Sequence, residues 1–168
     1  MFTGIQRPLF IKKLKNGSSS NMAVDASSTS QVFKIAPASN EIIRITNWMI
    51  YIQDAKGFNV NYFGSSPSLT NGLMPRLKVN DSINNMFEDG IKKNSDIASV
   101  TYDMQVHDFG GSGTDDILVA QIHFERDLLQ SIRLDGSQNS ELQVLVSDDL
   151  TSLTRVEVVA QGYYEKWI

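Results

Sequence analysis

Apolar and polar residues alternate over short stretches along most of this chain, with the period of two that is typical of β-strands. The stretches are rich in β-branched and aromatic residues, and turn-forming Gly, Pro, Asn, Asp and Ser bound them. Runs with a helical period are nearly absent. The pattern predicts an all-β fold, an antiparallel β-sandwich or jelly roll. The predicted strands cover residues 31–36, 41–53, 57–63, 73–79, 97–106, 117–125, 128–134, 141–147 and 154–164.

The longest alternating stretch, residues 41–53, changes phase in its middle. Ile43 and Ile45 fall on one face, whereas Ile50 and Ile52 occupy positions of the other parity. Because side chains alternate strictly along a strand, a change of parity requires an extra residue or a bend. The sequence therefore predicts a β-bulge near Asn47, of the kind found where a long strand passes from one sheet to another.

One short helix is predicted over residues 82–89. Asp81 can cap its first turn, and Ile83, Met86 and Phe87 have the i, i+3, i+4 spacing that places side chains on one helical face. A helix of this length is not stable alone. It is therefore expected to lie as a strap on the sandwich.

An extended N-terminal arm, residues 1–20, is expected to precede a single sandwich domain of residues 21–168. An isolated apolar and basic patch lies in this arm, before a turn-forming stretch at residues 16–20. Two arrangements are open: the patch crosses to a neighbouring subunit, or it adds an edge strand to its own domain. The residues of this candidate interface are Leu9, Phe10, Ile11, Lys12, Lys13 and Leu14.

Charge is distributed unevenly along the chain. Residues 1–95 hold 11 basic and 6 acidic side chains, whereas residues 96–168 hold 4 and 13. The two halves either cancel side by side in one sandwich or form opposite poles that steer self-association. Nucleic-acid binding is not expected, because the basic stretch from Arg7 to Lys15 lacks a series of aromatic residues interleaved with its lysines for base stacking, and Phe10 is its single aromatic residue.

Composition limits the chemistry further. A chain of 168 residues with 41% hydrophobic residues can form one packed domain without disulfides or metals. Cysteine is absent, which excludes thiol catalysis, zinc–thiolate sites and iron–sulfur clusters. No apolar run approaches the roughly 20 residues that span a bilayer, so no membrane partner is expected. The first residues do not resemble a secretory signal peptide, so export by that route is not expected.

A glycine-rich acidic loop at residues 107–116 is the best candidate for a cation site. Asp108, Asp115 and Asp116 offer carboxylate oxygens, which hard cations such as calcium prefer. The spacing matches neither an EF-hand nor a phosphate-binding loop. A plain loop between two strands is the favoured interpretation, and a calcium site is the competing hypothesis.

The chain lacks the usual catalytic patterns of its predicted fold. Its two histidines, His107 and His123, do not form the His-x-His pair with which jelly-roll enzymes hold a metal. No Gly-x-Ser-x-Gly motif is present. The sequence therefore predicts a protein that is not an enzyme and has no cofactor and no metal.

Asp148 and Asp149 are neighbours, so their side chains would point to opposite faces of a strand. The favoured interpretation is a polar loop in which Asp and Thr side chains cap a tight turn. Leu150 and Leu153 are then expected to reach into the core.

Aromatic side chains allow a second function, a carbohydrate-binding module that stacks sugar rings. Trp48 and Phe63 are expected in the core instead, and Tyr163 and Tyr164 are expected to divide between core and surface. The aromatic residues that could form such a sugar-binding platform are Trp48, Tyr51, Phe58, Tyr62, Phe63, Tyr163, Tyr164 and Trp167.

Three ordered segments together resemble a family of small structural proteins of tailed bacteriophages. The similar runs are spread over most of residues 20–164. The first segment runs from Asn21 to Ser30 and continues with Val32-Phe33-Lys34-Ile35 and Pro37. The second combines Ile42-Ile43-Arg44-Ile45 with Met49-Ile50-Tyr51-Ile52-Gln53-Asp54 and Leu69-Thr70-Asn71-Gly72-Leu73, and the third combines residues 146–153 with Ala160-Gln161-Gly162-Tyr163.

The resemblance implies a β-sandwich subunit of the virion, made in the host bacterial cytoplasm. It implies a non-enzymatic structural protein, either a capsid decoration (cement) protein or a neck or tail component. The implied partners are further copies of the chain, in a homo-oligomer, and other virion proteins such as capsid, neck or tail subunits. No catalytic residue is implied.

Overall fold

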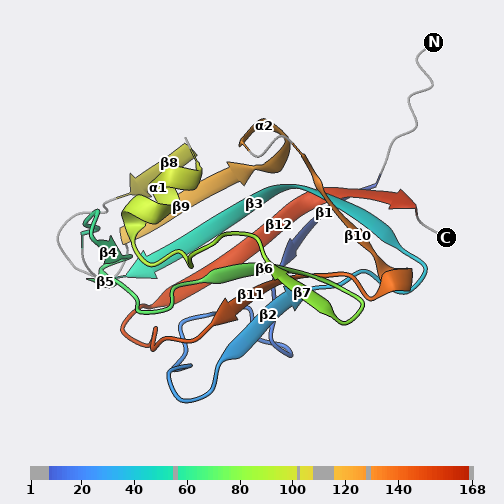
Figure 1. Cartoon of the computed structure of the whole chain (residues 1–168). Helices are drawn as coiled ribbons and strands as arrows, with labels where there is room; N and C mark the ends of the chain where they lie inside the picture. Colours follow the sequence, from blue (N-terminus) through green and yellow to red (C-terminus); the bar gives the residue numbers. More distant parts are fainter. Residues whose placement is uncertain (1–7, 55–56, 102, 108–115, 128–129, 167–168) are drawn as a thin grey trace, which may run out of the picture.

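The alternating stretches pair into two antiparallel sheets that face each other as a β-sandwich (Figure 1). This computed structural model describes residues 8–54, 57–101, 103–107, 116–127 and 130–166. The strands are β1 (Leu9–Lys13), β2 (Gln31–Ile35), β3 (Ile42–Asp54), β4 (Tyr62–Phe63), β5 (Ser66–Pro67), β6 (Met74–Val79), β7 (Ser82–Asn85), β8 (Asp103–His107), β9 (Asp116–His123), β10 (Ile132–Asp135), β11 (Glu141–Val146) and β12 (Arg155–Lys166). The helices are α1 (Asn94–Val100), α2 (Phe124–Asp127) and the 3-10 helix η1 (Gly136–Gln138).

The larger sheet has the strand order β1-β12-β3-β9-β8, and β10 also pairs with β3. Residues 42–45 of β3 pair with β10, whereas residues 47–54 pair with β9. The long strand therefore stays in one sheet and changes its neighbour, instead of passing to the second sheet. The smaller sheet has the order β2-β11-β6-β7, and β4 and β5 form a separate hairpin.

The predicted bulge near Asn47 is confirmed. Asn47 lies opposite Gln161 of β12, but Ile45 lies opposite Gly162, so Thr46 is an extra residue on β3. Buried positions accordingly switch from odd numbers, ending at Ile45, to even numbers from Trp48. The bulge keeps apolar side chains of both halves of β3 on the inner face.

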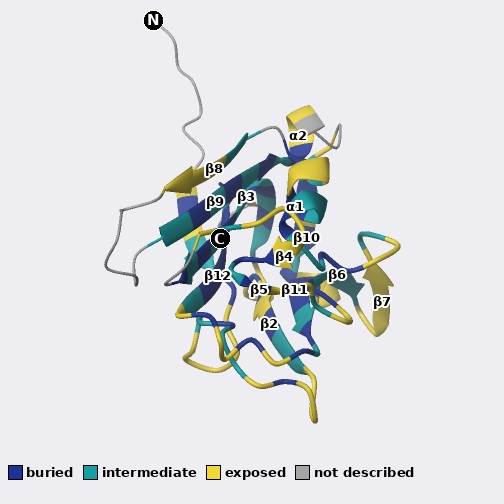
Figure 2. Ribbon diagram, turned by 90° about the vertical axis from the view of Figure 1, so that its left-hand side faces the viewer, coloured by how far each residue is buried: buried dark blue, intermediate teal, exposed yellow. Residues whose placement is uncertain are grey.

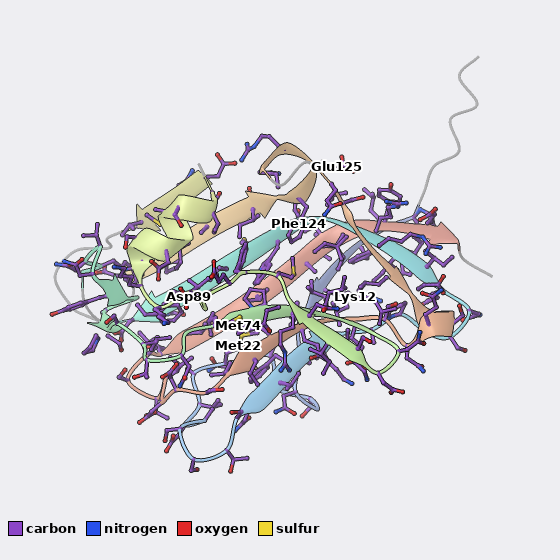
Figure 3. All side chains as sticks on the ribbon, viewed as in Figure 1. Lys12, Met22, Met74, Asp89, Phe124 and Glu125 are labelled. Atoms are coloured by element: carbon purple, nitrogen blue, oxygen red, sulfur yellow. The ribbon has the colours of Figure 1, made fainter. Side chains whose placement is uncertain are left out.

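The core lies between the two sheets, where Figure 2 shows the buried residues in dark blue. Met22 and Phe124, both labelled in Figure 3, belong to it. The Trp48 and Phe124 rings are 6.3 Å apart between centroids. The largest fully buried side chains are Trp48, Phe33, Phe63, Phe124, Leu14, Met22, Ile43, Ile45, Ile50, Ile52, Leu73 and Ile97.

The prediction of a helix at residues 82–89 is wrong. The chain turns at Asn80, whose φ of 53° is left-handed, and Ser82–Asn85 returns as β7 along β6. Ile83 lies opposite Lys78 and is 49% exposed. Pairing with an existing sheet edge forms backbone hydrogen bonds without the nucleation cost that makes an isolated eight-residue helix unstable.

The strand predicted at residues 97–106 is also wrong in its first half, which belongs to helix α1. The Asp96 carboxylate accepts hydrogen bonds from the backbone N–H groups of Lys92 (2.9 Å) and Lys93 (3.2 Å), and so holds the chain in the turn that begins the helix. Ile97 packs in the core from this helix. None of the helices in the described residues is long and apolar enough to cross a bilayer.

The prediction for residues 57–63 is confirmed only at its end, since the strand there is limited to Tyr62–Phe63. The other predicted strands correspond to β2, β3, β6, β9, β10, β11 and β12 with small shifts of their ends. Residues 128–129, at the start of the predicted 128–134 strand, lie outside the described residues.

Candidate functional site

The candidate interface at residues 9–14 is divided between the core and the surface. β1 pairs with β12 of its own sheet, from Leu9 opposite Tyr163 to Lys13 opposite Val159. Of the two arrangements that the sequence left open, the structure therefore has the edge strand. Phe10 and Leu14 are core residues and are not available to a partner, which corrects their assignment to the interface. Leu9 and Ile11 remain 82% and 73% exposed.

The backbone of β1 has one free side. Tyr164 N donates to Pro8 O (2.9 Å) and Leu14 N donates to Val158 O (2.9 Å), so the even-numbered residues of this stretch face β12. In an antiparallel ladder the intervening residues point their N–H and C=O groups the other way. Within the described chain, these outward groups of Leu9, Ile11 and Lys13 have no backbone partner.

A basic groove separates β1 from β2, the edge strands of the two sheets. Lys15 and Lys34 close one end, because each donates its N–H to the other's C=O, at 3.0 and 2.8 Å. Beyond this bridge lies an open groove of about 470 Å³. Its lining residues are Ile11, Lys12, Lys13, Lys15, Lys34, Ile35 and Ala36. We call this feature the basic groove.

Two of the groove lysines are paired with glutamates that are largely buried. Lys13 Nζ lies 2.7 Å from Glu157 Oε2, and Lys34 Nζ lies 2.7 Å from Glu141 Oε1. Burial raises the pKa of each carboxyl, but hydrogen bonds to charged and polar neighbours outweigh burial and lower the pKa of both below the usual 4.5. Arg155 also binds Glu157, at 2.8 Å.

These two glutamates predict a loss of stability in acid. A carboxyl whose pKa is lower in the folded chain favours the folded state above its unfolded pKa, and this contribution is lost as the pH falls through the lowered value. The free energy of unfolding is thus expected to stay level from pH 7 to about 5 and to decline below about 4.5. Urea unfolding at pH 7, 5, 4 and 3 measures this.

Glu157→Gln is the matched variant for the acid prediction, since the amide keeps the shape and removes the titrating group. Its stability should be lower than that of the unaltered protein at pH 7, and the difference should shrink toward pH 3. A difference that stays constant over this range would contradict the assignment.

The predicted cation loop lies mostly outside the described residues, and this includes Asp108 and Asp115. Asp116 is described, and it begins β9 opposite Asp54. In the described part of the chain, no three His, Asp or Glu side chains gather closely enough to hold a metal ion. The calcium hypothesis therefore stays untested.

The two histidines occupy different strands at one edge of the larger sheet. His123 Nε2 lies 3.0 Å from Asp103 Oδ2, and Arg126 Nη2 lies 3.0 Å from the same oxygen. His123 is thus hydrogen-bonded near the edge of the sheet. His107 ends β8 and is exposed.

Asp148 forms a buried polar clamp that the sequence did not indicate. Its carboxylate accepts hydrogen bonds from the backbone N–H groups of Thr70 (3.1 Å), Asn71 (3.1 Å) and Gly72 (2.8 Å). It thereby ties the β11–β12 connection to the chain that leads into β6. Asp149 caps the following turn as predicted, with its Oδ1 accepting from Thr151 N at 2.9 Å.

The expected burial of nearby apolar residues is confirmed. Leu150 and Leu153 are 0% and 4% exposed, and Trp48 and Phe63 are both fully buried. Tyr164 packs against the core, with its ring 5.6 Å from that of Phe10, while Tyr163 is half-buried. Trp167 lies outside the described residues.

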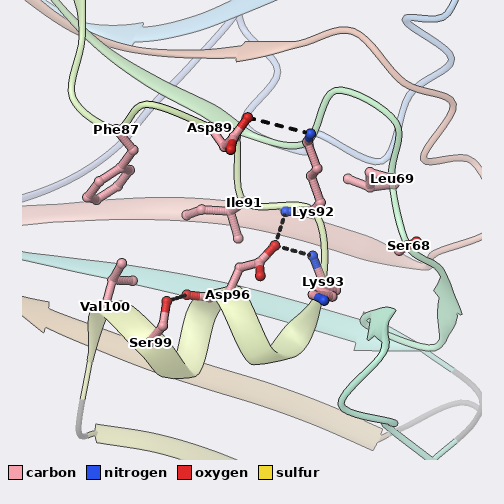
Figure 4. Close-up of a pocket in the computed structure, with 11 residues that line it drawn as sticks. Ser68, Leu69, Phe87, Asp89, Ile91, Lys92, Lys93, Asp96, Ser99 and Val100 are labelled. Atoms are coloured by element: carbon pink, nitrogen blue, oxygen red, sulfur yellow. Dashed lines mark hydrogen bonds and ion pairs between the residues drawn. The ribbon is translucent and has the colours of Figure 1, made fainter.

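A hollow of about 440 Å³ lies beside α1 (Figure 4). Its polar atoms mainly bind one another: Asp96 caps the helix, Lys92 Nζ lies 3.7 Å from Asp89 Oδ1, and Ser99 Oγ donates to Asp96 O. This hollow is thus explained by the local structure that holds α1 in place.

A larger hollow of about 590 Å³ lies between β7 and β10. Its lining residues include Asn84, Asn85 and Gln130, together with Arg133 and Phe87. Amides and guanidinium groups can donate hydrogen bonds to sugar hydroxyls, and an aromatic ring can pack on a sugar face.

A β-sandwich does not by itself define a function, because the same architecture supports many unrelated activities. Function is therefore inferred here from the open edge of β1 and from the basic groove. Comparisons with protein-family models, with curated proteins and with solved structures found no match to this chain.

Proposed function

We propose that the protein is a non-enzymatic structural subunit of a tailed-bacteriophage virion, a capsid decoration protein or a neck or tail component, that works through contacts between subunits. The observation that carries this proposal is the open edge of β1. Its outward backbone groups are free in the described chain, and Leu9 and Ile11 expose apolar side chains beside them. An edge of this kind is a template for pairing with another chain.

Charge along the larger sheet supports contacts between copies. β1, with Lys12 and Lys13, lies at one edge of this sheet, and β8, with Asp103, lies at the other. Asp116 is close to the β8 edge, on β9. Such a contact would be head-to-tail, between the two different edges of the sheet, and it closes into a ring when the rotation between subunits permits it. Lys13 and Asp103 already have partners within the chain, Glu157 and Arg126, so only part of this charge is open to a neighbouring copy.

Light scattering on a sizing column tests the proposal with the full-length protein and an Ile11→Pro variant. The Ile11 N–H points away from β12, so proline removes an outward donor and leaves the β1–β12 ladder intact. The unaltered protein is expected to form an oligomer at low salt, and Ile11→Pro is expected to be mainly monomeric. Deleting residues 1–20 would be a poor test, because Phe10 and Leu14 belong to the core.

Ile83→Pro is the matched control on the other sheet. Met86 N donates to Pro75 O, so Ile83 also points its N–H away from its neighbouring strand, and its side chain is 49% exposed. This variant should assemble like the unaltered protein. A monomer in every variant and at every salt concentration would overturn the proposal. That outcome would favour the alternative, a carbohydrate-binding module that uses the hollow between β7 and β10.

A further inference from the structure

We infer that the basic groove is an acceptor site for an extended acidic segment of a partner protein, which enters beside β1 as an added strand. This inference rests on the proposed function, since it specifies the kind of contact that the open edge makes. It follows from three features: the direction of the free backbone groups, the shape of the gap between β1 and β2, and the charge of the groove.

The outer edge of β1 can form backbone hydrogen bonds with an added strand, either antiparallel or parallel to it. Leu9, Ile11 and Lys13 each present one N–H and one C=O on the side away from β12, at every second residue. Only an extended polypeptide offers backbone donors and acceptors at that repeat. A nucleic acid or a lipid headgroup could satisfy the charge but not the alternating backbone groups.

The gap between the two sheets gives the added strand a defined end. Lys15 and Lys34 join the two edges through a pair of backbone hydrogen bonds, and the groove begins directly beyond them. A strand bound there would extend the larger sheet past β1 and cover the exposed Ile11 side chain, which lines the groove. Burial of such apolar surface adds to the affinity from backbone pairing.

The charge of the groove selects an acidic segment. Four lysines line it, and two of these, Lys13 and Lys34, are already neutralised by Glu157 and Glu141. Lys12 and Lys15 have no carboxylate within ion-pair distance among the described residues. Lys12 Nζ instead lies 5.3 Å above the Tyr164 ring. The groove therefore has an excess of positive charge that glutamate or aspartate side chains at alternate positions would neutralise.

Fluorescence anisotropy with labelled nine-residue peptides tests the inference on the full-length protein. The probes are an alternating Val–Glu peptide, an alternating Val–Lys peptide, and the Val–Glu peptide with proline at its central position. The Val–Glu peptide is expected to bind at least about tenfold more tightly than either of the others, and to weaken about tenfold as salt rises. Ile11→Pro should reduce its affinity by about tenfold, and Ile83→Pro should leave it unchanged.

Two further measurements separate this site from binding elsewhere. The double charge reversal Lys12→Glu, Lys15→Glu leaves the backbone unaltered and should abolish the preference for the Val–Glu peptide. The amide hydrogens of Leu9, Ile11 and Lys13 should exchange more slowly when that peptide is bound. Equal binding of acidic and basic peptides, or no binding of either at millimolar concentration, would overturn the inference.

The outcomes for the groove and for the proposed function are distinguishable. Self-association that Ile11→Pro abolishes, together with no peptide binding, would refute the acidic acceptor site and leave the structural role in place. Peptide binding by a protein that stays monomeric would support the acceptor site and count against self-assembly.

Discussion

Replacing Gly162 with alanine is expected to lower the free energy of unfolding by more than about 4 kcal/mol, or to prevent folding. A Cβ atom at this position would lie only 1.8 Å from the carbonyl oxygen of Arg44. Gly162 is at the bulge, where β12 and β3 shift register, so the clash is with backbone that has little freedom to move. The two central strands of the larger sheet would have to separate.

Gly57→Ala is the matched control for this prediction. Gly57 is exposed, and nothing lies within 4 Å of an added Cβ. Its stability should change by less than about 1 kcal/mol. Urea unfolding of both variants measures the difference, and a Gly162→Ala protein as stable as Gly57→Ala would show that β12 can move away from β3 at little cost.

Replacing Asp148 with alanine is expected to lower the free energy of unfolding by about 3 kcal/mol and the melting temperature by about 10 °C. The substitution removes the acceptor for three backbone N–H groups, those of Thr70, Asn71 and Gly72. Asp148 is only 9% exposed, so water cannot readily replace the carboxylate. The connection into β6 would lose its anchor to the β11–β12 connection.

Asp149→Ala is the neighbouring control. Asp149 is exposed and caps only its own turn, through Thr151 N and Thr151 Oγ1. Its loss should cost about 1 kcal/mol. Thermal unfolding followed by circular dichroism compares the two variants. Equal melting temperatures would mean that the buried clamp contributes no more than a surface cap.

The strands were largely predictable because their pattern reports burial on one face. Ile43 and Ile45, followed by Ile50 and Ile52, even located the bulge. Apolar residues at odd and then at even positions can face the same core only if the strand contains an extra residue between them. The partner of that bulge was not predictable. The sequence around Gly162 does not indicate that this residue contacts the backbone of Arg44, because the two residues are far apart along the chain.

The errors arose where apolar spacing was ambiguous. Ile83, Met86 and Phe87 fit one helical face, yet Ser82–Asn85 forms β7 because β6 offers an edge for pairing. Ile97 fitted an alternating strand, yet it belongs to α1, where Asp96 caps the first turn. Short stretches of this kind are decided by neighbours far along the chain.

The candidate site was only partly accessible from sequence. The sequence groups the basic and apolar residues from Leu9 to Leu14 into one patch, but the direction of each side chain depends on the register with β12. That register buries Phe10 and leaves Ile11 exposed. The contribution of Lys34 to the groove depends on β2 lying beside β1, which no local pattern indicates.

The central position of β12 has a consequence for synthesis on the ribosome. This strand lies between β1 and β3, so it pairs with a segment made early and with one made soon afterwards. Neither segment can gain this neighbour until residues 155–166 have left the exit tunnel. The larger sheet therefore cannot be completed before these late residues are available, and until then β1 and one edge of β3 stay unpaired and can associate with neighbouring nascent chains.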